Sequence, residues 1–214
     1  MNRLPRQSLT RIPTQARSVD MVHAILDAGV RVLQDEGTAR FTTNRVAEVA
    51  GVSPGSLYQY FANKDAVVAG IVERGVIDAE ERLRVVLAGD GLYQPIEVIV
   101  EGLLRTLAAG LEKYRPLLRE LLRVTPVSPE IGMMRVLETR IADLVRDWFT
   151  VQTGRYVVED PSATIYVVTP TLVYGFLRWI TDPWETLDID RFVAAMVRLV
   201  TTQVRPVDDG RDET

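Results

Sequence analysis

Residues 41–65, FTTNRVAEVAGVSPGSLYQYFANKD, decide the fold of this chain. They predict two short helices joined by a tight turn. Thr42 is the expected N-cap of a first helix over residues 43–50, because its hydroxyl can accept a hydrogen bond from a free backbone N–H of the first turn. Gly51 follows at the position where a helix ends with a positive φ. Ser53 is the expected N-cap of the second helix.

The second helix is expected to begin at Pro54, since a proline in the first position of a helix loses no hydrogen bond. Leu57 and Phe61 are four residues apart and should point together into the core. The outward face then holds Pro54, Gly55, Ser56, Tyr58, Gln59 and Tyr60. This face is small, polar and aromatic, and it has no Asp or Glu to repel phosphate. Two such helices and their Gly-containing turn are the parts of a helix-turn-helix.

The segment AGVSPGSLYQYFANKDAVV, residues 50–68, resembles the helix-turn-helix of the tetracycline-repressor (TetR) family. The family pattern is a turn Ala-Gly-Val-Ser, then Leu-Tyr, an aromatic pair ending in Phe, and a Lys that opens the next helix. The matching positions are Ala50, Gly51, Val52, Ser53, Leu57, Tyr58, Tyr60, Phe61 and Lys64. The close match covers residues 19–74, and beyond them only length and helical pattern agree. An ordinary αα-hairpin is the alternative, which the acid-free outward face disfavours.

The resemblance implies a fold class and a function. The fold would be all-α, with an N-terminal three-helix helix-turn-helix head and a C-terminal helical body for ligand binding and dimerisation, about nine helices in all. The chain would be a DNA-binding transcriptional regulator, most simply a repressor that leaves a palindromic operator when a small, largely hydrophobic effector binds. The alternative is a dimeric helical interaction module whose head binds protein rather than DNA.

The composition disfavours an enzyme. The 214 residues include no Cys and a single His, His23, so they offer no disulfide, no thiolate nucleophile and no cluster of zinc ligands. The carboxylates Glu80, Glu81, Glu112 and Glu120 are expected on solvated helix faces, without a nucleophile or metal partner. We therefore expect no catalytic residues, no cofactor and no metal.

The same composition favours a cytoplasmic location, since the chain lacks Cys. Residues 1–18 carry four Arg and no apolar core, so no signal peptide is expected. The longest apolar stretch, residues 163–180, contains Pro170 and Arg178 and predicts a buried helix rather than a membrane span.

The charge is unevenly distributed along the chain. The net charge of −4 alone disfavours nucleic-acid binding. Residues 1–64, however, hold eight of the 25 basic and five of the 29 acidic residues, an excess of positive charge. The remaining residues hold 17 basic and 24 acidic side chains. This asymmetry indicates a DNA-binding N-terminal segment.

Four segments are expected along the chain: a flexible basic arm over residues 1–18, a DNA-binding domain over 19–74, a ligand-binding and dimerisation domain over 75–205, and a disordered tail over 206–214. Ser18 is expected to cap a helix over residues 18–36, and Asn63 to cap one over residues 64–87. In the body, apolar periodicity predicts helices over residues 95–114, 116–124, 129–152, 161–181 and 189–204, with a short extended piece over residues 155–159.

Base-reading candidates come first from the second helix. Short polar side chains read base edges in the major groove, which favours Ser56 and Gln59, and Gln can pair bidentately with adenine. Pro54 and Gly55 let the backbone approach the bases and can contact thymine methyl groups. Asn44, at the start of the first helix, is a further candidate.

By resemblance, Thr43, Tyr58, Tyr60 and Lys64 contact phosphates, and their hydroxyl and ammonium groups suit that role. Arg45 is a weaker phosphate candidate. The arginines of the arm either reach DNA or only keep the terminus soluble, and the one nearest the first helix is the best candidate among them. The complete set is Arg17, Thr43, Asn44, Arg45, Ser53, Pro54, Gly55, Ser56, Tyr58, Gln59, Tyr60 and Lys64.

The effector site is expected in the body, in a mostly apolar pocket with a few polar groups. Its candidate lining is Leu104, Leu107, Leu111, Met133, Met134, Leu137, Trp148, Phe149, Tyr166, Tyr174 and Trp179, each of which is otherwise an ordinary core residue. The last two long helices are apolar nearly all round and must be covered on all sides. The resemblance implies a homodimer that packs these helices as a four-helix bundle, and a thick monomer core is the alternative.

Overall fold

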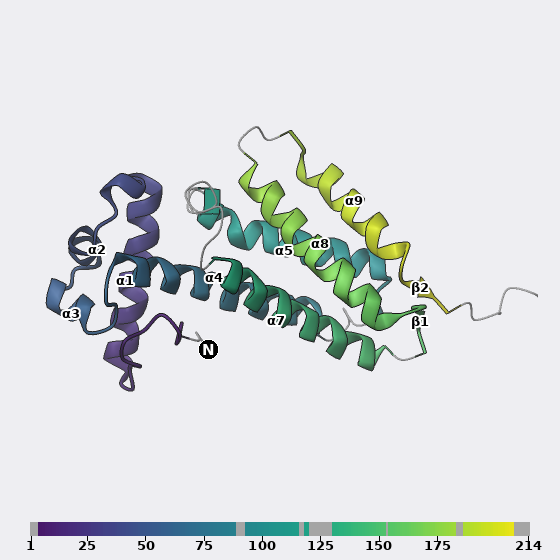
Figure 1. Ribbon diagram of the computed structural model, residues 1–214, viewed down its shortest axis with the longest axis horizontal. Helices are drawn as coiled ribbons and strands as arrows, with labels where there is room; N and C mark the ends of the chain where they lie inside the picture. The colour runs from purple at the N-terminus through teal and green to yellow at the C-terminus, as the bar shows by residue number, and fades with distance from the viewer. Residues whose placement is uncertain are drawn as a thin grey trace, which may run out of the picture. The chain divides into compact units, whose positions relative to one another are not determined.

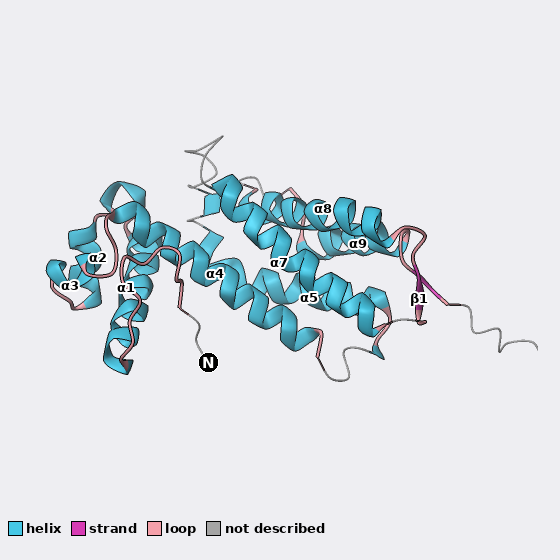
Figure 2. Ribbon diagram, turned by 60° about the horizontal axis from the view of Figure 1, so that its bottom comes forward, coloured by secondary structure: helices cyan, strands magenta, loops and turns pink. Residues whose placement is uncertain are grey.

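The computed structural model describes residues 4–88, 93–115, 118–119, 130–152, 154–182 and 186–207, with the backbone alone for residues 113 and 130–137. Eight α-helices lie within these residues (Figure 1): α1 (Ala16–Asp35), α2 (Thr43–Ala50), α3 (Pro54–Tyr58), α4 (Lys64–Val86), α5 (Ile96–Leu111), α7 (Glu130–Val151), α8 (Pro161–Thr181) and α9 (Ile189–Thr201). Two 3-10 turns, η1 (Thr38–Arg40) and η3 (Glu112–Tyr114), and two short strands accompany them. Helices dominate the described chain (Figure 2), so the expected all-α class is confirmed.

The chain forms two compact units. The head comprises Met1–Ala79 and Lys113–Pro126, and the body comprises Glu80–Glu112 and Val127–Thr214. The helix predicted over residues 116–124 lies almost wholly outside the described residues.

The core of the head is made by side chains from α1, α2, α3 and α4 and from the turn after α3. Its fully buried members include Val22, Ile25, Leu26, Leu57, Phe61, Val67 and Ile71. Burying each such side chain contributes about 1.5–3 kcal/mol relative to leaving it in water. Leu57 and Phe61 lie in this core, as their spacing predicts, and they hold α3 against the rest of the head.

The N-terminal end of α1 differs from the prediction. Ser18 is the third residue of the helix rather than its cap, and its hydroxyl donates to the backbone oxygen of Gln15 over 2.7 Å. The backbone N–H of Gln15 in turn donates to this hydroxyl over 3.3 Å. The helix therefore begins two residues earlier than predicted, because a serine can close a capping box from inside the first turn.

Residues 5–14 fold onto the head, so the prediction of a flexible arm is wrong for them. Pro5 and Pro13 are buried, and Gln7 and Ser8 bond to Glu73 of α4. The partner lies more than 60 positions away, which is why the Arg-rich composition of this segment shows no sign of the contact.

The body is built from α5, α7, α8 and α9, with α5 packed on α9, α7 on α8, and α8 on α9. Aromatic side chains join the last two helices: the Trp179 and Phe192 rings stack with centroids 5.1 Å apart, and Phe176 lies 6.2 Å from Phe192. Side-chain caps begin both helices, because Asp160 accepts from the Ala163 N–H and Asp188 from the Arg191 N–H, each over 2.9 Å.

A two-stranded antiparallel pair closes the described part of the body. Strand β1 (Tyr156–Val157) pairs with β2 (Arg205–Pro206), with Tyr156 opposite Pro206 and Val157 opposite Arg205. The Val207 N–H continues the pairing by donating to the backbone oxygen of Arg155 over 2.8 Å. The tail predicted to be disordered from residue 206 therefore starts with two ordered residues, and residues 208–214 lie outside the described ones.

Candidate nucleic-acid interface

Two side-chain caps form the two short helices of the head. The Thr42 hydroxyl accepts from the Arg45 N–H over 3.1 Å, and the Ser53 hydroxyl accepts from the Ser56 N–H over 3.1 Å. Between the helices, Gly51 adopts φ +69°, a conformation that costs a glycine little and other residues more. The bounds predicted for α2 are confirmed, whereas α3 ends at Tyr58.

The exposed side of α3 carries most of the residues predicted to face outward. Pro54, Gly55 and Gln59 are exposed, Tyr58 is 49% exposed, and Ser56 is half-buried. The cap residue Ser53 is also exposed, and its hydroxyl lies 2.9 Å from that of Ser56. The outward surface of α3 therefore presents hydroxyl, amide and phenol groups, with no carboxylate from residues 53–60.

Tyr60 is the exception on this side. Only 7% of its surface is exposed, so the prediction that its side chain faces outward is wrong. The helix ends at Tyr58, and Tyr60 lies in the turn that leads to the buried Phe61. A phosphate contact by Tyr60 stays a prediction.

A hydrogen bond joins the two short helices at their outer ends. The Thr43 hydroxyl, at the start of α2, lies 2.9 Å from the Tyr58 hydroxyl at the end of α3. Asn44, the next residue, is exposed. Two residues predicted to contact phosphates thus present their hydroxyl groups at one point, where both could bind the same anion.

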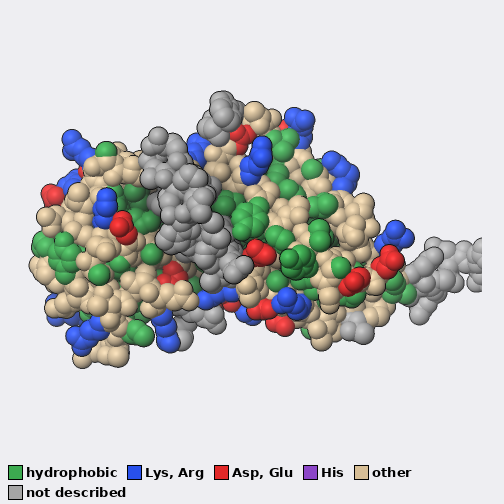
Figure 3. Space-filling view, viewed as in Figure 1, with side chains coloured by type: hydrophobic (Ala, Val, Ile, Leu, Met, Phe, Trp, Pro, Cys, Tyr) green, Lys and Arg blue, Asp and Glu red, His purple; other side chains and the backbone are tan. Residues whose placement is uncertain are grey.

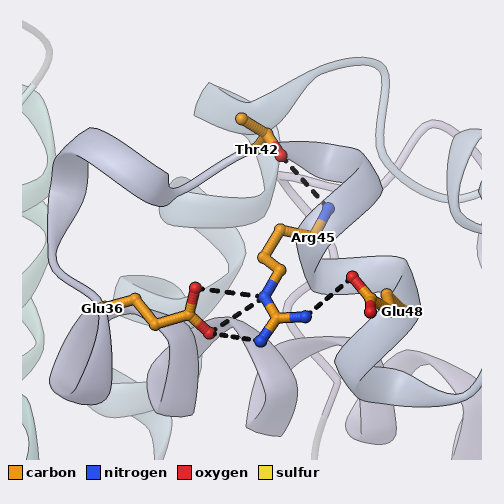
Figure 4. A network of polar contacts seen from close by, with 4 residues as sticks. All are labelled: Glu36, Thr42, Arg45 and Glu48. Carbon is orange, nitrogen blue, oxygen red and sulfur yellow. Dashed lines mark hydrogen bonds and ion pairs between the residues drawn. The ribbon is translucent and has the colours of Figure 1, made fainter.

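Arg45 is held by carboxylates rather than left free for phosphate (Figure 4). Its guanidinium donates to Glu36, at the end of α1, over 2.7 Å and to Glu48 over 2.7 Å. The hydrogen bond from Arg45 lowers the pKa of Glu36, and the bonds to Glu36 and Glu48 raise the pKa of Arg45. The arrangement ties α1 to α2, so we assign Arg45 chiefly to the stability of the head.

The remaining DNA candidates lie at the start of α1 and α4. Arg17 and Lys64 are both exposed, and neither has an ion-pair partner among the described residues. Lys64 opens α4, whose predicted cap is confirmed because Asn63 accepts from the Ala66 N–H over 2.8 Å. These cations remain available to a polyanion.

The effector candidates differ widely in burial within the described part of the body. Leu104 and Trp148 are buried, at 4% and 6% exposed, and Leu107, Leu111, Phe149 and Trp179 are half-buried. Tyr166 and Tyr174 are 82% and 46% exposed, so they do not lie in the core of the single chain, and their role in an effector pocket stays a prediction. The side chains of Met133, Met134 and Leu137 lie outside the described residues.

Two tryptophans of the body, the buried Trp148 and the half-buried Trp179, use their indole nitrogens differently. Trp179 donates to the backbone oxygen of Leu187 over 2.7 Å. Trp148 lies beside Phe149 and Tyr156, with ring centroids at 5.1 and 5.4 Å, and its buried indole nitrogen has no acceptor among the described residues. Trp148 therefore has a buried N–H group left to offer an effector.

Several residues of the head that matter for its geometry give no signal in the sequence. Glu73 binds Gln7 and Ser8, and Glu36 pairs with Arg45 nine positions away. Neither contact follows a helical spacing, so only the folded chain reveals it. No group of three or more His, Cys, Asp or Glu suited to a metal ion occurs within the described residues.

Comparisons with known proteins agree with this geometry. Residues 25–71 match the family model of bacterial regulatory proteins, tetR family. The nucleoid occlusion factor SlmA of Marinomonas sp. (strain MWYL1) is 30% identical over 122 residues, which are 56% of this chain and 59% of that protein. The matched part is thus well short of that relative's full length.

Two solved structures share the fold over most of their length. SmeT, the repressor of the Stenotrophomonas maltophilia multidrug efflux pump SmeDEF, superposes with a TM-score of 0.59 at 21% identity, covering 88% of this chain and 91% of that one. Thermus thermophilus FadR, a TetR-family repressor solved with lauroyl-CoA, superposes with a TM-score of 0.56 at 21% identity. The match covers 84% of this chain and 92% of that one. The helix-turn-helix region of this chain thus matches the TetR family model, and the whole chain shares its helical fold with TetR-family structures.

Proposed function

We propose that this chain is a homodimeric, DNA-binding transcriptional regulator, most simply a repressor, which leaves a palindromic operator when a small, largely hydrophobic molecule binds its body. The observation that carries the proposal is the outward face of α3. Ser53 caps this helix, and the residues from Pro54 to Gln59 are exposed except for the half-buried Ser56 and the buried Leu57. None of these residues carries a carboxylate. A short helix of this kind fits the major groove, where an acid would repel the phosphates on either side.

The contacts with DNA divide into two kinds. Gln59 and Ser56 would read base edges, with Gln59 exposed enough to pair with an adenine. The hydroxyl pair of Thr43 and Tyr58, together with Lys64, would bind phosphates and set the register of α3 along the groove. Arg45 would act indirectly, by holding α2 against α1.

The second copy of the chain would cover α8. This helix buries Ile165, Thr169, Val173, Phe176 and Ile180 inside the body. Its other side exposes Tyr166, Val167 and Tyr174, at 82%, 60% and 46%. The helix is long and apolar enough to cross a membrane, yet only 28% of its most apolar window is buried in the single chain.

An exposed apolar surface of this kind marks an interface. A second α8 would cover it with the same side chains, as a two-fold dimer requires. Two-fold symmetry then places two α3 helices on two half-sites and accounts for a palindromic operator. A regulator of this kind works in the cytoplasm, with the DNA it binds.

The effector would be recognised within the body. The ligand of Thermus thermophilus FadR, lauroyl-CoA, is a long apolar acyl chain with a polar head, and it supports an apolar ligand here. Leu104 and Trp148 would contact the apolar part of such a ligand, and the unpaired indole nitrogen of Trp148 would donate to a polar atom of it.

Helix α4 would carry the effect of the ligand. Within the body, the buried Glu80 of α4 accepts from Arg140 of α7 over 2.8 Å and from Arg84 over 2.9 Å. Burial raises the pKa of Glu80, but the hydrogen bonds from the two arginines outweigh it and leave the pKa lowered. A ligand that displaces α7 would therefore pull on α4, which also belongs to the head. To lower the DNA affinity tenfold, the effector must bind the DNA-incompetent state more tightly than the DNA-binding state by about 1.4 kcal/mol.

The test is the affinity of the chain for DNA taken from its own upstream region. Wild type should protect a discrete site, and the double substitution Tyr58→Ala with Gln59→Ala should abolish protection while circular dichroism shows an intact fold. Tyr93→Ala removes an exposed tyrosine from the body and serves as the control. If the double variant keeps its affinity, α3 is not the DNA-reading helix, and a protein-binding head becomes the better account.

A further inference from the structure

Residues 5–14, the N-terminal strap, are fastened to α4 by one carboxylate. The Gln7 N–H donates to both oxygens of Glu73 over 3.1 Å, and the Ser8 N–H and Ser8 hydroxyl donate to Oε2 over 3.2 and 3.1 Å. Hydrogen bonds to an ionised acceptor are stronger than those between neutral groups. Three donors on one side chain make Glu73 the main polar anchor of the strap.

Packing supports the same course of the chain. The Pro5 side chain is fully buried and Pro13 is buried, so both ends of the strap are fixed. Between them the strap approaches Gly70 closely: a Cβ at Gly70 would lie 3.1 Å from the Ser8 hydroxyl and 2.9 Å from the Phe61 ring. The glycine leaves room for the strap, one turn of α4 before Glu73.

The strap also contacts the end of the candidate DNA-reading helix. The Thr10 N–H donates to the backbone oxygen of Tyr60 over 2.9 Å, just beyond the last residue of α3. Tyr60 itself is buried. Glu73 thus fixes the strap at Gln7 and Ser8, and the backbone of Tyr60 fixes it at Thr10. The residues between and beside these contacts therefore have a defined place next to the end of α3.

Those neighbouring residues are cations. Arg6 and Arg11 flank the anchored stretch, are exposed, and have no hydrogen bond or ion pair with any residue that the structure describes. This contrasts with Arg45 of α2, which Glu36 and Glu48 neutralise. Figure 3 shows several Lys and Arg side chains along the lower edge of the head.

We propose that the strap is a built part of the DNA interface: Arg6 and Arg11 bind backbone phosphates beside α3, and Glu73 is the positioning residue that holds them there. The inference rests on the proposed function, because it adds a second contact to the same duplex. The partner is a polyanion, and the free charges of the strap are complementary to it.

A substitution at Glu73 tests the inference by whether DNA binding becomes stronger or weaker. Removing a negative charge from a DNA-binding head should strengthen binding if the charge acts only at long range. If Glu73 holds the strap, Glu73→Gln should weaken binding instead. Its amide keeps one acceptor oxygen, but the charge is lost and an NH2 donor takes the place of the second oxygen that accepts from Gln7 and Ser8. Asp20→Asn is the matched control, since Asp20 is an acid of the head with no partner among the described residues.

The experiment measures DNA affinity of the full chain against salt concentration, by fluorescence anisotropy with a duplex to which wild type binds. The loss of one phosphate contact lowers the salt slope by about 0.9. Arg6→Gln with Arg11→Gln removes two such contacts from each subunit and four from the proposed dimer, so it should lower the slope by about 3.6. Glu73→Gln should lower both the salt slope and the DNA affinity, as the double arginine variant does. Asp20→Asn should leave the salt slope unchanged and the DNA affinity unchanged or higher. Arg205→Gln, an exposed arginine of β2, controls for charge alone.

The slope separates positioning from simple damage to the fold. A partly unfolded protein loses affinity by the same factor at every salt concentration, so its slope does not change. If Glu73→Gln melts too early to assay, Ser8→Ala removes one of the donors on Glu73 and should shift the slope in the same direction by less.

Two results would overturn the inference. A double arginine variant with the slope of Arg205→Gln would show that the strap does not touch DNA. A normal slope, or tighter binding, in Glu73→Gln would show that Glu73 does not position the strap. A wild-type protein that binds no duplex at any salt concentration would refute the proposed function itself.

Discussion

The outward faces of α3 and α8 are opposite in chemistry although both belong to helices with a buried side. The face of α3 offers a proline, a glycine, hydroxyl groups, an amide and a phenol. The face of α8 offers Tyr166, Val167 and Tyr174. The polar groups of the α3 face can replace their hydrogen bonds to water with bonds to a charged surface. The α8 face lowers its free energy only when another apolar surface covers it.

This difference assigns a separate partner to each face. In the proposed function, base edges and phosphates would satisfy the polar groups of α3, and a second copy of the chain would cover the apolar strip of α8. The two partners would be linked, because a dimer binds two half-sites at once and each bound head raises the effective concentration of the other.

The largest expected effect comes from charging the face of α8. Val167→Glu with Tyr174→Glu places two like charges in the proposed interface, where burial of an unpaired charge is costly. We expect monomers at micromolar concentration and DNA affinity lowered by about 100- to 10,000-fold, the usual gain from two linked sites. Light scattering coupled to gel filtration and a DNA titration measure the two quantities.

Val157→Glu is the control for this change. Val157 is an exposed valine of β1, 56% exposed, and the same substitution there should leave both the mass and the affinity unchanged. A charged α8 that still forms dimers would show that the partner of this face has been misassigned.

The next effect in size concerns sequence reading by α3. Gln59→Ala should cost about 1–3 kcal/mol on the specific operator, because one good bidentate contact discriminates by that amount. Affinity for a random duplex should hardly change, since phosphate contacts remain. Equal losses on both duplexes would make Gln59 a phosphate or folding residue instead.

A smaller effect is expected at the junction of α2 and α3. Tyr58→Phe removes the hydroxyl that lies 2.9 Å from the Thr43 hydroxyl. The loss of one hydrogen-bonding group should cost about 1 kcal/mol, roughly fivefold in affinity, on specific and random duplexes alike. Thr43→Val should give the same loss, and the double variant less than the sum of both, if the two hydroxyls bind one phosphate.

The smallest effect concerns the stability of the head and its dependence on pH. The hydrogen bond from Arg45 lowers the pKa of Glu36 from 4.5, so the pair stabilises the folded head above pH 4.5 and loses this contribution as the pH falls through the lower, folded value. Amide hydrogen exchange in α2 should show Glu36→Gln less protected than wild type at pH 6, with the difference shrinking toward pH 3. A difference that grows on acidification would contradict the pairing.

The bounds of α2 and α8 are predictable to the residue because their caps are local. Thr42 and Asp160 each accept a bond from a backbone N–H three residues on, and short-range rules of this kind can be read from the sequence. The acid-free face of α3 follows from the same local reasoning, together with the burial of Leu57.

The strap, Tyr60 and the exposed tyrosines of α8 could not be predicted in this way. The strap depends on Glu73, whose partners are 65 and 66 positions away, and an Arg-rich segment with two prolines resembles a free terminus until that contact forms. The expected burial of Tyr166 is not found in the single chain, because an apolar helix indicates burial without indicating which chain covers it.

The most direct test of the account is a selection of bound sequences from random duplexes with wild type and with Gln59→Ala. The account predicts an inverted repeat of two half-sites for wild type, and the same repeat with one base position per half-site relaxed for the variant. Enrichment of a sequence without two-fold symmetry, or an identical base preference in both proteins, would contradict it.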